Sequence, residues 1–204
     1  MWRELYRIGL LEGILPNMGE RLRQAISAID TANSADPRGK EMVYSQRMTE
    51  WLFRLELNPS EALQLAARAQ HIRRWEIARN SYPLGRIGYL QWRTALYAHH
   101  ARIAGEILQS VGCDPITMDH VERLLRKQGI KTDSDMQILE DVACLVFLEY
   151  ELADFAGQHP EEKVIDILRK TWRKMSSRGH AAAEAILPSL PNSLAQLIAR
   201  ARAE

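Results

Sequence analysis

Apolar residues recur with a helical period along most of the chain. Within residues 20–32, for example, Leu22, Ala25, Ile26 and Ile29 follow the i, i+3, i+4, i+7 spacing of an amphipathic helix. No stretch of useful length alternates between apolar and polar residues as a half-buried strand would. The pattern predicts an all-α fold of about eight helices, over residues 20–32, 40–55, 61–69, 86–111, 117–129, 136–155, 160–175 and 193–202.

The length and the proline positions indicate how this bundle is organised. A chain of 204 residues is long enough for one complete hydrophobic core, which favours a single helical domain. Pro16 interrupts the first segment, and Pro188 and Pro191 separate the last helix from the rest. We therefore expect an N-terminal extension at 1–17, a helical domain at 18–187 and a short C-terminal helix within 188–204.

Composition and charge exclude several classes of function. A hydrophobic fraction of 46% and a charged fraction of 26% are typical of globular proteins, and no apolar run is long enough to span a membrane. The net charge of +1 gives no general attraction to nucleic acid, and the two cysteines cannot form a disulfide framework. These features predict a cytoplasmic protein without a membrane or nucleic-acid partner, and they leave a homo-oligomer open.

One stretch, residues 66–76, concentrates the polar side chains that need partners. An alanine-rich helix runs into Gln70 and His71, and Arg74 and Trp75 follow directly. Each of these groups requires a hydrogen bond or a counter-charge if it leaves water. The stretch therefore predicts a functional site, with His71 as its natural general base.

Two other helices carry polar residues on apolar faces. In the helix at 86–111, His100 and Arg93 lie on the apolar stripe, although His100 taken alone is better explained as a core histidine satisfied by a backbone carbonyl. In the helix at 136–155, Asp141 is expected to point into the core, with Glu149 on the same ridge and Glu140 on the adjacent stripe. Buried carboxylates are rare unless they are paired or bound to metal, so a structural ion pair with an internal arginine is the alternative to a catalytic role.

Cationic and aromatic residues indicate what such a site would bind. Arginine presents a planar fork that suits phosphate or carboxylate, and tryptophan can stack on a planar ligand. The alternatives are solvated surface charge and tryptophans that close a core. The residues expected to hold a small anionic ligand are Arg47, Gln70, Arg74, Trp75, Trp92, Arg93 and Lys127.

The order of these features resembles the HD superfamily of helical metal-dependent phosphohydrolases. The resemblance covers about residues 40–155, through Tyr44–Met48, the stretch ending at Gln70-His71, the segment from His100 to Leu108, and the helix that carries Asp141 and Glu149. It implies an HD-domain-like fold, a divalent metal ion and hydrolysis of a phosphorylated substrate. Tyr44 and Gln70 stand where that family has metal ligands, so the implied metal set is a rearranged one. This set comprises His71, His100, Asp141 and Glu149.

A second family is similar over more of the chain. The segments Tyr44–Met48, Ala69–Glu76, Gly88–Arg93, Leu139–Glu149 and Lys163–Trp172 resemble an uncharacterised group known as domain of unknown function 4202. The resemblance extends from Met18 to His180 and implies no particular activity.

Two functions follow as competing hypotheses. The first is a hydrolase for a small phosphorylated or anionic substrate, in which His71, Asp141 and Glu140 are catalytic and a divalent metal, where bound, activates water. The second is a non-catalytic binding module for a nucleotide or another anion, which the substitutions at Tyr44 and Gln70 favour. A third reading, an RNA-associated or protein-interaction domain, rests on the basic run 170–174, for which charge at the end of a helix is a simpler explanation.

Overall fold

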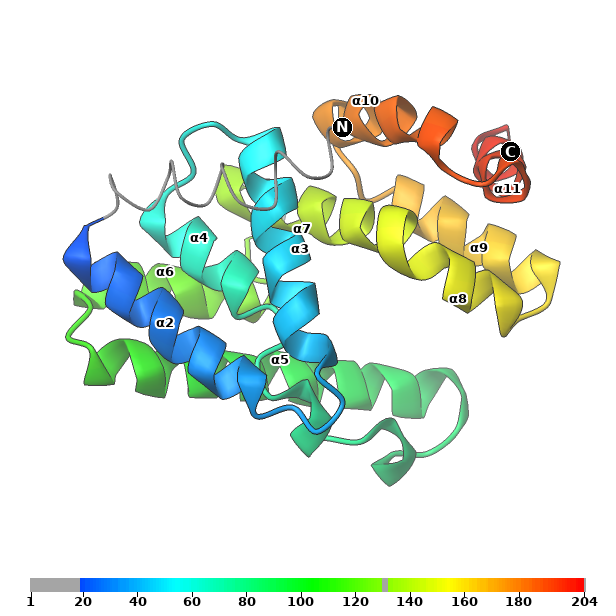
Figure 1. Cartoon of the computed structure of the whole chain (residues 1–204). Coiled ribbons are helices and arrows are strands. Elements are labelled where there is room, and N and C mark those ends of the chain that lie inside the picture. Colours follow the sequence, from blue (N-terminus) through cyan, green and yellow to red (C-terminus); the bar gives the residue numbers. More distant parts are fainter. Residues whose placement is uncertain (1–18, 130–131, 204) are drawn as a thin grey trace.

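The computed structural model describes residues 19–129 and 132–203, and these residues form ten α-helices without a strand (Figure 1). The prediction of an all-α fold is confirmed, whereas the expected extension at 1–17 lies outside the described residues. No helix in the described ranges is long and apolar enough to cross a membrane. The helices are α2 (Glu20–Ser34), α3 (Lys40–Leu55), α4 (Glu61–Arg68), α5 (Gly85–Ser110), α6 (Pro115–Leu125), α7 (Ser134–Val146), α8 (Leu152–Gly157), α9 (Glu161–Trp172), α10 (Ser177–Ile186) and α11 (Asn192–Arg202).

Short polar side chains fix where several helices begin. Ser60 accepts a hydrogen bond from the backbone N–H of Leu63 and caps α4, and Asp133 caps α7 in the same way. The helix expected from Thr117 begins earlier, because Asp114 is the cap and Pro115 occupies the first turn.

The structure has two helices more than the sequence predicts. The stretch 136–155 is divided by a π-helical turn at Phe147–Glu151, which separates α7 from α8. After α9 the chain breaks and starts again as α10, because the Ser176 side chain accepts the N–H of Gly179 and caps a new helix.

The core is built around α4, whose alanines allow neighbouring helices to approach closely. Leu63, Ala66 and Ala67 are completely buried, and α4 packs against α2, α3, α6 and α7. Arg68 ends this helix inside the protein, where Nε and Nη2 donate to Asp30 of α2 at 2.5 and 2.7 Å. The half-buried Asp30 thus neutralises the buried Arg68 charge and ties α4 to α2.

Figure 1 shows the helices in two groups joined by α3 and α7. Helices α2, α4, α5 and α6 lie at one end, and α8 to α11 lie at the other, where α11 packs on α9. The loop before α5 and the beginning of α5 lie near the beginning of α3. This arrangement brings the polar stretch 66–76 between the first turn of α3 and the middle of α5.

Candidate functional site

The stretch after α4 is an irregular loop held by two histidines of α5. The His100 Nδ1 nitrogen donates to the Ile72 carbonyl oxygen at 2.8 Å, and the His99 Nε2 nitrogen lies 3.2 Å from the Arg73 carbonyl oxygen. Arg73 itself has a φ of 49°, in the left-handed region that residues with a side chain rarely adopt. This turn starts a 3₁₀ helix at Arg74–Glu76 and directs the chain back towards α3.

His100 is a core histidine satisfied by a backbone carbonyl, which is the alternative that its sequence position left open. The residue is 3% exposed, and burial lowers the pKa of its imidazole to about 3. Because a carbonyl oxygen can only accept, the proton of the neutral ring is on Nδ1. Nε2 has no hydrogen-bond partner among the residues that the structure describes.

His71 is held on three sides by residues of α3 and of its own loop. The Tyr44 ring stacks on the imidazole with centroids 3.8 Å apart and an interplanar angle of 9°. Glu41 Oε2 lies 3.5 Å from Nδ1, and Arg74 Nη1 lies 3.4 Å from Nε2. An arginine can only donate, so Nε2 is the acceptor and the proton on Nδ1 faces the Glu41 carboxylate.

The charges around His71 decide which groups are ionised. Burial, reinforced by the Arg74 guanidinium, lowers the pKa of His71 well below its ordinary value, so the ring is neutral near pH 7. Burial raises the pKa of Glu41 to about 7, against the opposing influence of Arg74. Burial also raises the pKa of Glu151, which lies close enough to Glu41 to repel it. The pair of Glu41 and His71 therefore changes its protonation near neutral pH.

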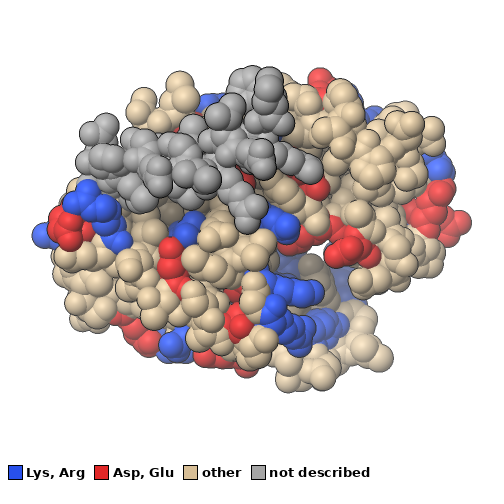
Figure 2. All heavy atoms as spheres, viewed as in Figure 1, with Lys and Arg blue, Asp and Glu red and all other residues tan. Residues whose placement is uncertain are grey.

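A pocket of about 560 Å³ opens beside this pair, between the beginning of α3 and the loop before α5. Glu41 and Arg74, which contact the two nitrogens of His71, form part of its wall. Figure 2 shows a hollow beside the beginning of α3, with Lys and Arg gathered along one wall and Asp and Glu across it. The pocket is lined by Asp36, Arg38, Lys40, Glu41, Arg74, Trp75, Ile77, Ala78, Arg79, Asn80, Leu84 and Trp92.

The acidic and aromatic residues of the pocket are partly occupied by local contacts. Both Asp36 carboxylate oxygens accept backbone N–H groups from the turn and the first residues of α3. Trp92 donates its indole N–H to the Ile77 carbonyl at 2.9 Å, and the Arg74 guanidinium lies 4.7 Å from its ring centre. The Trp92 indole therefore holds the loop through Ile77 and makes a cation–π contact with Arg74.

A second polar layer lies deeper, where the end of α6 meets α7. The Lys127 ammonium donates to Glu140 Oε1 at 2.9 Å and to Gln70 Oε1 at 3.3 Å. Burial lowers the pKa of Lys127. Burial alone would raise the pKa of Glu140, but the charge and hydrogen bond of Lys127, together with the charges of Lys174 and Arg93, hold that pKa below its ordinary value. Lys127 has a φ of 58° at the position after α6 where glycine is usual.

The predicted acidic residues of α7 and the π-helical turn have other partners. Asp141 accepts hydrogen bonds from the backbone N–H of Ser176 at 2.8 Å, from the Ser176 hydroxyl and from Gln137 at 3.0 Å, so it anchors the beginning of α10. Glu149 accepts the indole N–H of Trp51 at 2.7 Å. Glu140, expected to be catalytic, is paired with Lys127 as described above.

The predicted metal set is consequently not assembled. The structure places the His71 and His100 rings with their centroids 6.1 Å apart. Asp141 and Glu149 do not join them, because their carboxylates accept the backbone N–H of Ser176 before α10 and the indole N–H of Trp51 in α3. Within residues 19–129 and 132–203, no group of three or more His, Cys, Asp or Glu residues is placed to hold a metal ion. The residues present do not fit the ion that the resemblance implied, and no chemical step is derived through one.

The predicted ligand-binding residues divide between the pocket and the interior. Arg74, Trp75 and Trp92 line the pocket, and their binding of a ligand stays a prediction. The others have different partners: Gln70 and Lys127 contact each other in the deeper layer, Arg47 lies over the Tyr150 ring at 4.3 Å, and Arg93 contacts the Tyr97 hydroxyl.

Five charged pocket residues were missed from the sequence. Asp36 and Arg38 belong to a turn that composition alone identified, and Lys40 and Glu41 begin a helix whose pattern marked only its apolar face. Arg79 lies in the irregular stretch 77–85, where its guanidinium donates to two backbone carbonyls of the loop. A charged turn directly before a buried helix was the available signal, because such a turn must lie at the rim of the core.

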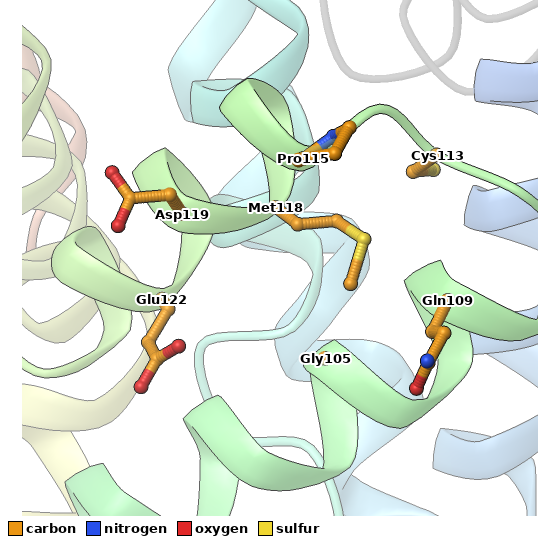
Figure 3. Close-up of a pocket in the computed structure, with 7 residues that line it drawn as sticks. All are labelled: Gly105, Gln109, Cys113, Pro115, Met118, Asp119 and Glu122. Atoms are coloured by element: carbon orange, nitrogen blue, oxygen red, sulfur yellow. The ribbon is translucent and has the colours of Figure 1, made fainter.

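A second hollow, of about 480 Å³, lies between the end of α5 and α6. Figure 3 shows the Met118 side chain extending towards Gly105 and Gln109, with Asp119 and Glu122 on the other side. Its walls contain no Lys, Arg or His. Its two carboxylates pair with Arg123 and Arg126 of α6 and the turn that follows it, so the hollow offers no cationic group to an anionic ligand.

The fold and the pocket define an all-helical protein with a basic, tryptophan-lined cavity over a buried polar layer. The chain belongs to the family described as Domain of unknown function (DUF4202), whose profile matches residues 23–198. No curated protein matches the chain. No solved structure matches it either.

Proposed function

We propose that this protein binds a small phosphorylated ligand in the pocket at the beginning of α3. The observation that carries the proposal is a group of four cationic side chains that line the pocket without a direct ion pair. Arg38, Lys40, Arg74 and Arg79 line the pocket, and among the described residues none of them forms an ion pair within 4.0 Å of a carboxylate. Arginine forks and a lysine ammonium in a partly enclosed cavity are suited to phosphate oxygens.

The size and the walls of the pocket support a ligand with an organic part. A volume of about 560 Å³ lies in the range of small-molecule sites, which combine apolar walls with a few polar groups. Trp75, Ile77 and Leu84 supply apolar surface beside the cations. Nucleotides and other phosphorylated metabolites of similar size have both components.

A thermal-shift panel tests the binding proposal. Nucleoside phosphates, sugar phosphates and inorganic phosphate would be added to the full chain, with calorimetry on any compound that raises the melting temperature. A ligand at a hundred times its Kd should stabilise the protein by about 2.7 kcal/mol. Arg74→Gln should lose the effect, whereas Arg102→Gln, an exposed change on the same helix bundle, should keep it. A flat response across the panel would refute the proposal.

Hydrolysis of the bound ligand is a second candidate function, favoured by the contact between Glu41 and His71. The Glu41 carboxylate faces the protonated Nδ1 and so orients the imidazole with the Nε2 lone pair towards Arg74. Carboxylate–histidine pairs of this kind act as general bases. The Tyr44 ring prevents the imidazole from rotating out of this orientation.

In this reading Arg74 would hold a phosphate oxygen and His71 would activate water. The water oxygen would attack phosphorus while Nε2 takes its proton, and the bond to the leaving oxygen would break. The imidazolium, stabilised by Glu41, would then return its proton to the leaving oxygen, so protons balance over the cycle. Glu140 and Asp141 take no part, because their carboxylates are occupied.

Phosphate release measured with and without EDTA tests this second candidate. His71→Gln and Glu41→Gln should both bind ligand but lose turnover, by about a hundredfold or more for a general base. Turnover that persists in His71→Gln, with the fold intact by circular dichroism, would exclude the mechanism. Turnover that disappears with EDTA would exclude a metal-independent reaction.

A further inference from the structure

Exposed apolar side chains gather at the beginning of α5, next to the pocket. In the described part of the chain, three large apolar residues follow each other at intervals of three: Leu84, Ile87 and Leu90, with exposed fractions of 95%, 75% and 49%. Residues three apart are neighbours on a helix surface, so these side chains form a continuous stripe. Contiguous exposed apolar surface of this kind is a marker of a binding surface.

The stripe begins at the exposed edge of the pocket. Leu84 is a lining residue of the pocket and also the residue that precedes the first turn of α5, from which Ile87 and Leu90 continue along the helix. Tyr89 is on the other side of α5, where its ring packs against Trp92. The cationic wall and the apolar stripe thus meet at Leu84.

Continuity and charge together indicate what covers the stripe. The pocket supplies at least four cationic side chains at one end, and the stripe supplies apolar surface that leads away from them. A purely polar ligand would leave the stripe in water, and a purely apolar one would leave the cations unpaired.

We propose that the ligand is an amphiphilic phosphate monoester, with its phosphate in the cationic pocket and its alkyl chain on the stripe formed by Leu84, Ile87 and Leu90. This inference rests on the phosphate binding proposed above and names the class of ligand. The same chemistry is found in a free alkyl phosphate and in the headgroup of an anionic lipid such as phosphatidic acid. In both cases the chain leaves the pocket past Leu84.

Calorimetry with ethyl phosphate and hexyl phosphate, below its micellar concentration, tests the proposal on the full chain. Full burial of one methylene changes Kd by about fourfold, and a chain on an open surface buries about half of that area. Hexyl phosphate should therefore bind roughly tenfold more tightly than ethyl phosphate. The double variant Ile87→Ser, Leu90→Ser should retain the affinity for ethyl phosphate and lose this dependence on chain length.

A matched control uses Leu57→Ser and Ile116→Ser, two apolar residues that are both 83% exposed and lie outside the stripe. The control should keep the dependence on chain length. Equal affinities for the two phosphates, or loss of the dependence in the control, would overturn the inference while leaving phosphate binding intact. Failure of both phosphates to bind would overturn the proposed function as well.

Vesicles distinguish the two sources of the ligand. Sedimentation with phosphatidylcholine vesicles that contain phosphatidic acid, but not with phosphatidylcholine alone, would support the proposal and identify a membrane lipid. Binding of soluble hexyl phosphate without vesicle binding would support it and identify a free ligand. Light scattering that shows a dimer lost in the Ile87→Ser, Leu90→Ser variant would overturn it, because the stripe would then be covered by a second copy.

Discussion

Lys127 offers the sharpest test of the buried polar layer. Its ammonium is the nearest cation to Glu140, and the side chains of both residues are only 11% exposed. Lys127→Met removes the charge but keeps an unbranched side chain. Glu140 would then be buried without its main partner, which is the situation in which breaking an ion pair is most costly.

The structure sets an upper limit on that cost. Glu140 can escape an unpaired charge by taking up a proton, and its ordinary pKa is 4.5. Protonation on folding costs 1.36 kcal/mol for each pH unit above that value, so the limit is about 3.4 kcal/mol at pH 7 and about 0.7 kcal/mol at pH 5. Lys174 and Arg93 also lower the pKa of Glu140, so the observed loss should lie somewhat below the limit.

The sign of the pH dependence separates this reasoning from simple loss of packing. In the wild type the pKa of Glu140 is lowered, so its contribution to stability is present above pH 4.5 and lost as pH falls. In Lys127→Met the pKa is raised, so stability decreases as pH rises from 4.5. Urea unfolding monitored by circular dichroism should therefore show a larger deficit at pH 7 than at pH 5.

Two further variants complete the test. Glu140→Gln combined with Lys127→Met should be more stable than Lys127→Met alone at pH 7, because no buried charge remains. Lys127→Gly should be more stable than Lys127→Met by about 1 kcal/mol, because glycine adopts the positive φ without strain. An equal deficit at both pH values would refute the argument.

Three other predictions follow from close contacts and from burial. Gly88→Ala should destabilise the protein by about 1–3 kcal/mol in urea unfolding, because its Cβ would lie 1.9 Å from a backbone oxygen of the preceding loop. The control Gly105→Ala, whose Cβ would have nothing within 4 Å, should stabilise the protein by up to about 1 kcal/mol. Gly179→Ala should also cost about 1–3 kcal/mol, because its Cβ would lie 2.7 Å from the Asp141 carboxylate. An unchanged free energy of unfolding would contradict the anchoring of α10 by Asp141. The pKa of His100 is lowered from 6.5 to about 3, so its neutral form stabilises the fold above pH 6.5 and loses about 2 kcal/mol by pH 5. His100→Asn, which keeps a donor near Nδ1, should show a smaller loss over the same pH range.

Helical periodicity located most elements because it reports on a local property, the face that each segment buries. It could not reveal the π-helical turn at Phe147–Glu151, since one extra residue in a long apolar helix changes the spacing only slightly. It also left open the break before α10. That helix begins where Ser176 is held by Asp141, thirty-five positions earlier in the chain, a contact that no local pattern contains.

The sequence predicted where the candidate site lies, but not which residues contact each other there. The sequence identified His71 and Arg74 because polar residues at the end of an apolar helix must find partners. The partners themselves depended on tertiary structure. Asp141 points inward as its spacing predicts, but its partner is Ser176, the residue that caps α10. The carboxylate that lies beside His71 is instead that of Glu41.

Backbone strain supports the view that the two polar layers serve a function. Among the described residues, only Arg73 and Lys127 have a positive φ without being glycine, at a cost of about 1–2 kcal/mol each. Glycine would relieve that cost at both positions. Instead, the turn at Arg73 places Arg74 against one side of His71, and Lys127 directs its ammonium to Gln70, the neighbour of His71 in sequence. Strain that persists at both positions indicates that side-chain placement there outweighs stability.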